Sequence, residues 1–299
     1  MSSARPDEAG PVRIVTATSA CLDLVQAREL GVTLVPLRVG FGDRELRDVE
    51  EISPHDVVGL VRRGEVLRTS SPPPGDYLAA FEAAGGPVLC LSEASSMSAI
   101  NSSAKVAAQM LGDGRVEVVD TGTAAGGMRL LTLEAARLAR AGVGLEELRH
   151  RIAALAARVE VVGMLETVEF LVRSGRIPEI AHWGASLLRV RPVVRFQPPS
   201  GSLAALARSP VKGVRELHNL AVRDVKRQNG GSRGEQVHGS VFHADAPELA
   251  DELLGRLRHD LPQAELSASE VTAAMIVHVG PGLVGYGLYV DPEDLAEAD

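Results

Sequence analysis

Short runs of β-branched and aliphatic residues alternate with longer amphipathic stretches along the first half of the chain. Such runs predict strands, and the spacing of apolar positions between them predicts helices. The predicted strands are residues 12–16, 33–39, 88–91 and 116–119, and the predicted helices are 22–30, 54–63, 75–84, 96–111 and 123–141. This alternation is typical of a mostly parallel, doubly wound α/β sheet, whose ligand-binding loops follow the carboxyl ends of the strands. The loop after residue 91 is one such place.

A second unit is predicted to begin near residue 160, after a helix over 145–158. Its pattern gives strands at 159–165, 190–196, 237–243 and 273–279, and helices at 167–173, 211–227 and 247–261. The strand at 190–196 carries arginines at alternate positions, which is typical of one polar face of a half-buried strand. We therefore predict two α/β domains, residues 11–160 and 161–290.

The composition points to an aliphatic interior. The chain has 299 residues, of which 45% are hydrophobic but only 3% aromatic. Such a core accommodates a flexible hydrocarbon, whereas it offers few rings on which bases or sugars could stack.

Charge and cysteine content exclude several classes of function. The net charge is −8 and no basic cluster is interleaved with aromatic residues, so nucleic acid is not an expected partner. Two cysteines and eight scattered histidines give neither a disulfide framework nor metal-ligand spacing. No apolar run approaches the roughly 20 residues that span a bilayer, and we expect a cytoplasmic protein without a cofactor.

A hydroxyl-rich turn precedes a run of three prolines. Thr69, Ser70 and Ser71 stand before Pro72–Pro74. The prolines fix φ and remove backbone donors, so the hydroxyls are held in one place, which suits a small oxyanion better than bond-breaking. The alternative is that these hydroxyls only cap the helix that begins near residue 75.

Two further segments are candidate partners of this turn. One contains Ser95 and Ser96; the other is His278 followed by the turn Gly280–Gly282. Residues 280–285 match G-x-G-x-x-G, but no further strand is expected after them, so we predict a tight turn near a close backbone approach and not a dinucleotide site. His278, at the end of the predicted last strand, is either structural or part of the site.

A serine/histidine acyl hydrolase is the alternative function. One of Ser95, Ser96 or Ser98 would be the nucleophile, with His278 as base and Asp120 as the orienting acid. The chain lacks G-x-S-x-G, and nothing in the sequence places Asp120 behind the histidine.

Two arginines lie at the C-terminal end of the predicted helix at 167–173. Arg173 and Arg176 either complement the negative end of the helix dipole, or hold a carboxylate, a phosphate or a partner.

Taken in order, these segments resemble the DegV family, also called the EDD-fold family, which includes the bacterial fatty-acid-binding FakB proteins. The resemblance is carried by Ile14-Val15-Thr16 with Ser19-Ala20, Gly31–Leu37, Phe41-Gly42, Arg47-Asp48, Thr69-Ser70 with Pro72, Ser95–Ser98, Val118–Thr121, Glu166–Leu171, Ser174–Ile177, Arg191–Val193, and His278 with Gly280–Gly282. The resemblance extends from residue 14 to residue 285. Each segment alone is a weak signal, and the family is indicated by their occurrence together in this order.

The resemblance implies a non-enzymatic carrier with a long-chain fatty acid buried in a tunnel between two α/β domains, the second of which completes the lipid site. The fatty-acid carboxylate would be held by Thr69, Ser95 and His278, that is, by two hydroxyls and an imidazolium. Ser70, Ser96 and Gly280 complete the implied binding residues.

The resemblance also implies a partner. A kinase resembling dihydroxyacetone kinase would convert the bound acid to an acyl phosphate for lipid synthesis, with Arg176 and Arg208 facing it. The family's basic run after residue 208 is interrupted here by Pro210. Because the ligand would be fully enclosed, we expect a lid between Phe170 and Leu188.

Overall fold

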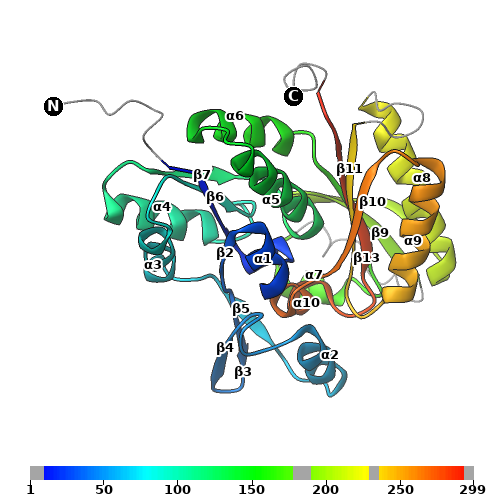
Figure 1. Cartoon of the computed structure of the whole chain (residues 1–299). Coiled ribbons are helices and arrows are strands. Elements are labelled where there is room, and N and C mark those ends of the chain that lie inside the picture. The colour runs from blue at the N-terminus through cyan, green and yellow to red at the C-terminus, as the bar shows by residue number, and fades with distance from the viewer. Residues whose placement is uncertain (1–9, 178–189, 229–235, 293–299) are drawn as a thin grey trace.

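The computed structural model describes residues 10–177, 190–228 and 236–292, and two β-sheets dominate it (Figure 1). The first sheet has the order β2-β1-β6-β7 and is parallel throughout. Its strands are β1 (Arg13–Ala17), β2 (Val32–Val35), β6 (Val88–Ser92) and β7 (Val116–Asp120). This confirms the predicted parallel, doubly wound sheet.

Helices cover both faces of this sheet. Tyr77 and Phe81 of α3 (Pro74–Ala84) and Ile100 of α4 (Ile100–Leu111) belong to the core on one face. On the other face, α5 (Ala125–Arg140) and α6 (Leu145–Ala156) bury Leu131 and Leu148. The short helix α1 (Leu24–Leu30) and the 3₁₀ turn at 18–20 connect β1 to β2.

A small antiparallel sheet projects below the first one in Figure 1. Its order is β4-β3-β5, formed by β3 (Arg38–Phe41), β4 (Arg44–Arg47) and β5 (Arg68–Ser70). The single strand predicted at 33–39 is therefore two strands that belong to different sheets, separated by Pro36. Helix α2 (Pro54–Arg62) connects β4 to β5, and it begins as predicted, because Ser53 and Asp56 form a capping box before it.

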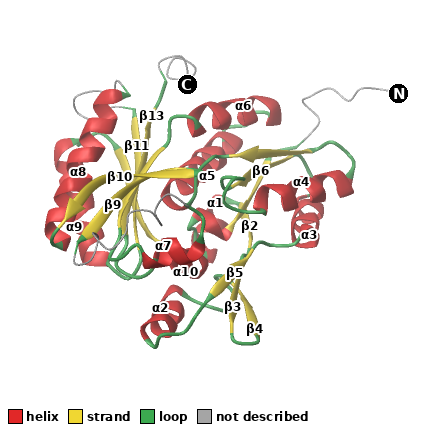
Figure 2. Ribbon diagram, turned by 180° about the vertical axis from the view of Figure 1, so that it is seen from behind, coloured by secondary structure: helices red, strands yellow, loops and turns green. Residues whose placement is uncertain are grey.

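The third sheet has six strands in the order β10-β9-β8-β13-β11-β12 (Figure 2). The strands are β8 (Glu160–Met164), β9 (Arg191–Gln197), β10 (Ser200–Ala207), β11 (Val237–His243), β12 (Glu265–Glu270) and β13 (Val284–Val290). Helices α8 (Pro210–Arg227) and α9 (Pro247–Asp260) cover its outer face, while α5 of the first half packs against β11 and β13 on its inner face.

The end of the chain differs from the prediction in two places. Residues 273–279 form the helix α10 (Ala273–Val279) and not a strand. The prediction was wrong because these residues are almost all buried, and a continuous apolar run shows no amphipathic period that would distinguish a helix from a strand. The Gly-Pro-Gly turn then enters β13, where we expected no further strand. β13 is buried at every position and lies in the middle of the six-stranded sheet.

Arg195 of β9 takes part in a charge network inside the second half of the chain. Arg195 forms an ion pair with Asp224 of α8 at 2.9 Å, and Asp224 also accepts a hydrogen bond from the Tyr286 hydroxyl at 2.7 Å. Glu160 is a further partner of Arg195. Such a buried network is viable because each charge is met by an opposite one.

The first strand of the six-stranded sheet along the chain is β8. The largest hydrophobic cluster nevertheless joins residues of both halves, including Phe81, Val194 and Ile276. The domain limits 11–160 and 161–290 stay a prediction.

Candidate functional site

A cavity of about 950 Å³, counting its open mouth, lies between the two large sheets. Its apolar lining includes Leu37, Met97, Ala124, Ala125, Val161, Leu171, Phe196, Pro198, Phe242, Val271, Met275, Val279 and Leu283. Its polar lining consists of Thr69, Ser70, Ser71, Glu93, Ser98, Thr123, Arg176 and His278.

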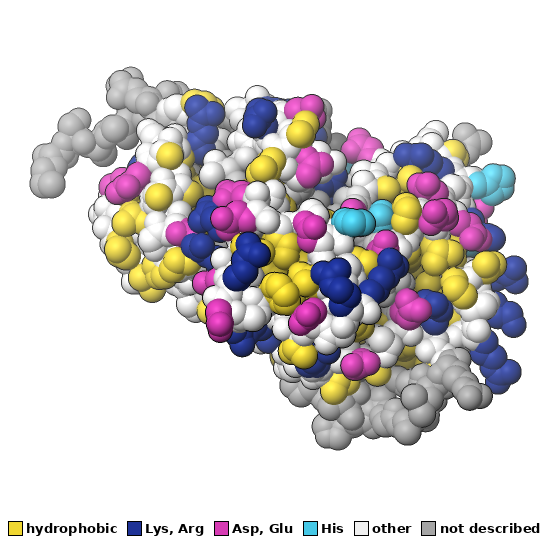
Figure 3. All heavy atoms as spheres, turned by 90° about the horizontal axis from the view of Figure 1, so that it is seen from below, with side chains coloured by type: hydrophobic (Ala, Val, Ile, Leu, Met, Phe, Trp, Pro, Cys, Tyr) yellow, Lys and Arg dark blue, Asp and Glu magenta, His cyan; other side chains and the backbone are white. Residues whose placement is uncertain are grey.

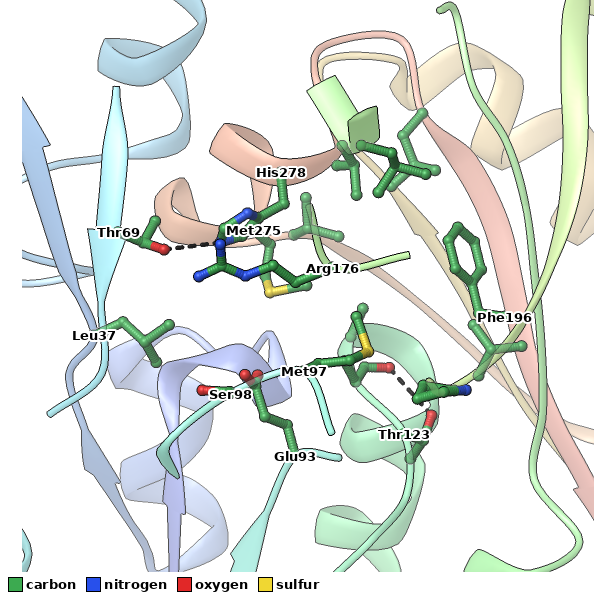
Figure 4. Close-up of a pocket in the computed structure, with 18 of the residues that line it drawn as sticks. Leu37, Thr69, Glu93, Met97, Ser98, Thr123, Arg176, Phe196, Met275 and His278 are labelled. Atoms are coloured by element: carbon green, nitrogen blue, oxygen red, sulfur yellow. Dashed lines mark hydrogen bonds between the residues drawn. The ribbon is translucent and has the colours of Figure 1, made fainter. Parts of the chain in front are cut away.

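The polar side chains are not spread evenly over the cavity wall. Figure 4 shows Thr69, Arg176 and His278 on one side of the cavity together with Glu93 and Ser98, and Phe196 and Thr123 on the other. We call the first group the polar end.

The six-stranded sheet supplies much of the apolar wall. Val161 of β8 and Phe196 of β9 are paired in register, and Phe242 comes from β11. Between them runs β13, where Gly285 has no side chain; a Cβ there would lie 2.6 Å from Phe242. The glycine therefore gives the Phe242 ring the space it occupies beside the cavity.

Thr69 and His278 meet at the polar end although 209 positions separate them in the sequence. Thr69 Oγ1 lies 2.8 Å from His278 Nε2. Thr69 is on β5, directly before the proline run, and His278 is in the last turn of α10. The structure thus brings together two of the three residues expected to hold a carboxylate.

The protonation of the His278 imidazole depends on its surroundings. Burial, assisted by the nearby Arg176 guanidinium, lowers the pKa of His278 to about 4. The ring is therefore neutral at neutral pH. Its Nδ1 is buried and has no hydrogen-bond partner among the residues that the structure describes.

The serine segment after β6 is oriented differently from our expectation. Ser95 and Ser96 are exposed and lie outside the cavity lining, whereas Ser98 lines it. The reason is that α4 begins at Ile100 and not at residue 96, so residues 94–99 form a turn. The Ser98 hydroxyl lies 3.1 Å from that of Ser71.

Ser70 and Gly280 have different positions. Ser70 lines the cavity, and its hydroxyl donates to Glu45 at 2.6 Å. Gly280 is not part of the lining. It ends α10 with φ +74°, and a Cβ there would lie 2.3 Å from the Phe170 ring, so it is required for packing.

The two arginines assigned to partner docking are also separated. Arg176 is half-buried and lines the cavity at the polar end; its guanidinium donates to the Ser174 carbonyl at 2.7 Å. Arg208 is exposed between β10 and α8. The expected lid at 170–188 lies largely outside the described residues.

Glu93 is a cavity residue that the sequence analysis did not single out. It is 8% exposed, and burial raises the pKa of its carboxyl; hydrogen bonds from the Ser98 and Ser19 hydroxyls and the charge of Arg176 act in the opposite direction. Its position immediately after a central parallel strand is the signal that could have identified it.

The triad required for a serine hydrolase is not assembled. The Asp120 carboxylate accepts hydrogen bonds from the backbone N–H groups of Ser95 and Gly122, at 3.2 and 3.0 Å. It does not stand behind His278, whose Nδ1 has no partner in the described part of the chain. Among the described residues, the polar end therefore lacks the arrangement that activates a nucleophile.

Other kinds of site find little support among the described residues. No helix there is both long and apolar enough to cross a membrane, and no group of three or more metal-ligating side chains occurs in the same ranges. Figure 3 shows basic and acidic side chains interspersed over most of one face, with apolar side chains between them.

Sequence comparison identifies relatives over nearly the full length of the chain. Residues 11–291 match the family described as "Uncharacterised protein, DegV family". A DegV domain-containing protein of Streptomyces coelicolor is 31% identical, with 92% of this chain and 96% of the relative covered. One from Deinococcus radiodurans is 30% identical, with 93% and 98% covered.

Solved structures with the same fold have been described with bound lipids. A DegV family protein from Thermus thermophilus, described for its fatty acid binding, has a TM-score of 0.86 and 28% identity, with 94% of this chain and all of that chain covered. The Streptococcus pneumoniae Fatty Acid Kinase B3 protein, loaded with linoleic acid, has a TM-score of 0.80 at 21% identity, with 94% and 100% covered, and shows the shared fold. By its sequence match and its architecture, this chain belongs to the DegV family.

Proposed function

We propose that this protein binds one long-chain fatty acid and presents its carboxylate to a fatty acid kinase. The hydrocarbon tail lies in the apolar part of the cavity and the carboxylate lies at the polar end. The observation that carries the proposal is the pairing of Thr69 with His278 at the edge of an apolar cavity, in a chain whose relative from Thermus thermophilus is described for fatty acid binding.

The apolar wall supplies the affinity. Each methylene removed from water contributes about 0.8 kcal/mol. A tail of about twelve methylenes thus contributes on the order of 10 kcal/mol before the cost of ordering the ligand is subtracted. The apolar part of the lining has no aromatic side chain other than Phe196 and Phe242. It therefore favours a flexible hydrocarbon tail over a ligand with a particular ring system.

The polar end supplies the donors that a buried carboxylate requires. An ionised carboxylate is expensive to bury unless hydrogen bonds and an opposite charge meet it. Thr69 and Ser98 offer hydroxyls, His278 offers a ring nitrogen, and Arg176 offers a guanidinium. Hydrogen bonds that involve a charged partner are the stronger kind, so this set is sufficient.

A chain-length series tests the binding step. The protein is delipidated and titrated with saturated fatty acids of eight to eighteen carbons. Affinity should rise about fourfold per methylene until the cavity is full, which is the equivalent of about 0.8 kcal/mol. Hexadecanol, which has the tail without the acid, is the matched control and should bind more weakly than palmitate. Equal affinity for octanoate and palmitate would refute the proposal.

Presentation to a kinase requires that the carboxylate end of the ligand be reachable. In this reaction a carboxylate oxygen attacks the γ-phosphorus of ATP, a new O–P bond forms, and ADP leaves. The half-buried Arg176 and the exposed Arg208 are the candidate contact residues, and the Streptococcus pneumoniae protein with this fold is named as a fatty acid kinase component.

The kinase step is tested separately from binding. Protein loaded with radiolabelled palmitate is mixed with a dihydroxyacetone-kinase-like fatty acid kinase and ATP, and acyl phosphate is trapped with hydroxylamine. The Arg208→Ala variant should lose rate while retaining full palmitate binding. Arg28→Ala, an exposed arginine of α1, is the control. Absence of any ATP-dependent hydroxamate would refute presentation but leave binding intact.

A further inference from the structure

The polar end contains a carboxyl group of the protein itself. Glu93 lines the cavity at the polar end, together with Arg176 and His278 (Figure 4). It is 8% exposed, burial raises the pKa of its carboxyl, and the charge of the Arg176 guanidinium acts in the opposite direction. A site proposed for a fatty-acid carboxylate thus already holds one carboxyl group.

The surroundings of Glu93 can be named element by element. Ser98, from the turn before α4, and Ser19, from the 3₁₀ turn after β1, donate hydrogen bonds to it. Arg176 faces it from the segment after α7. Cys21 and Tyr77 lie near enough that a charged Glu93 raises the pKa of each, and His278 lines the same cavity from α10.

Within the described lining, Arg176 is the one lysine or arginine side chain. Cys21 and Tyr77 have no positively charged form. Burial and the Arg176 guanidinium lower the pKa of His278 to about 4, so its ring is neutral at neutral pH. If Glu93 and the ligand were both ionised, two buried carboxylates would depend on a single guanidinium. Two carboxyl groups that share one site do not both ionise easily, and one of them keeps a proton.

We infer that Glu93 determines how the head group binds: Glu93 and the fatty-acid carboxyl share one proton across the polar end, and the protein takes up a proton when a fatty acid binds. This inference rests on the proposed function. The shared proton forms an O–H···O hydrogen bond between the two groups, so that one negative charge remains and is met by Arg176. No other chemical step is involved.

The coupling has a measurable consequence. At pH values where Glu93 is ionised in the free protein, each fatty acid brings one proton from solution, and affinity falls up to tenfold per pH unit. At lower pH, where Glu93 is already protonated, affinity does not depend on its titration. In a Glu93→Gln variant, the side chain has the same size and can still form hydrogen bonds, but it does not ionise and so cannot take up a proton.

Calorimetry counts this proton directly. Laurate is titrated into delipidated protein between pH 6 and pH 9, in phosphate and in Tris, whose ionisation enthalpies differ. Wild type should take up close to one proton per laurate at the upper end of this range, and Glu93→Gln should take up none. Glu146→Gln, which alters an exposed carboxylate of α6, is the matched control and should behave as wild type.

Each outcome decides the matter. No uptake by wild type at any pH, with laurate bound, overturns the inference and leaves fatty-acid binding standing. Equal uptake by wild type and Glu93→Gln also overturns it, because the proton would then go to another group such as His278. Absence of laurate binding at every pH refutes the proposed function together with the inference.

Discussion

Replacing His278 by glutamine should make the ligand-free protein less sensitive to acid. The ordinary pKa of histidine is 6.5, and in the folded protein burial and Arg176 lower the pKa of His278 to about 4. Between these values the unfolded chain binds a proton that the folded protein does not. Stability therefore decreases as the pH falls from 6.5 to 4, and it is unaffected by this group above that window.

The size of the effect follows from the two values. With a folded pKa of about 4, the loss of stability reaches about 2 kcal/mol at pH 5 and approaches about 3 kcal/mol below pH 4. The buried carboxyls of Asp48 and Glu93, whose pKa values are raised by burial, act in the opposite direction. They are present in both proteins, so the difference between wild type and variant isolates the histidine.

Urea unfolding of delipidated wild type and His278→Gln at pH 7.5, 6 and 5 measures this difference. The stability of the variant relative to wild type should rise by about 2 kcal/mol between pH 7.5 and pH 5. His259→Gln, which removes an exposed histidine of α9, should show no such trend. If the free energies of unfolding of wild type and His278→Gln differ by the same amount at all three pH values, His278 is not a buried neutral ring.

Three further predictions concern other parts of the chain. Thr69→Val removes the hydroxyl that faces His278 while keeping the side-chain shape, and should weaken palmitate binding about tenfold in a fluorescence displacement assay. Gly280→Ala should cost about 2 to 4 kcal/mol in thermal or urea unfolding, because its Cβ meets Phe170 and its backbone is in a glycine-only region. Cys21, whose burial raises its thiol pKa to about 12, should resist maleimide labelling until the protein is unfolded; labelling of the native protein at the rate of free cysteine would contradict this.

Much of the fold could be predicted because the local signals agree with the tertiary structure. The strands of the parallel sheet are short apolar runs, and α2 has both a capping residue and a proline at its start. The meeting of Thr69 with His278 followed from the family resemblance. The burial and neutral state of the imidazole did not, since they depend on how α10 packs between the two halves of the chain.

The strand β13 was missed because its glycines look like a turn. In the folded protein, Gly287 lies against the backbone of α5, where a Cβ would be 2.8 Å from Gly126. Gly285 makes room for Phe242 in the same way. The glycines therefore reflect close helix–sheet packing, a tertiary cause that no local pattern along 284–290 reveals.

Local sequence patterns likewise could not show that Ser98 lines the cavity and Ser95 does not. Both serines lie in one turn, and which of them faces inward depends on where α4 begins. The helix starts only at Ile100, without a side-chain cap, so the sequence holds no clear start signal. Glu93 was overlooked for a related reason, because a lone glutamate after a strand is usually solvated.

The polar end is assembled from both halves of the polypeptide: Thr69, Glu93 and Ser98 come from the first, and Arg176 and His278 from the second. A fragment of either half would therefore lack part of the polar end. If the protein binds a fatty acid as proposed, a movement that separates the two halves would part Thr69, Glu93 and Ser98 from Arg176 and His278 while it opens the apolar wall. The acid group and the tail would then lose their contacts in the same step.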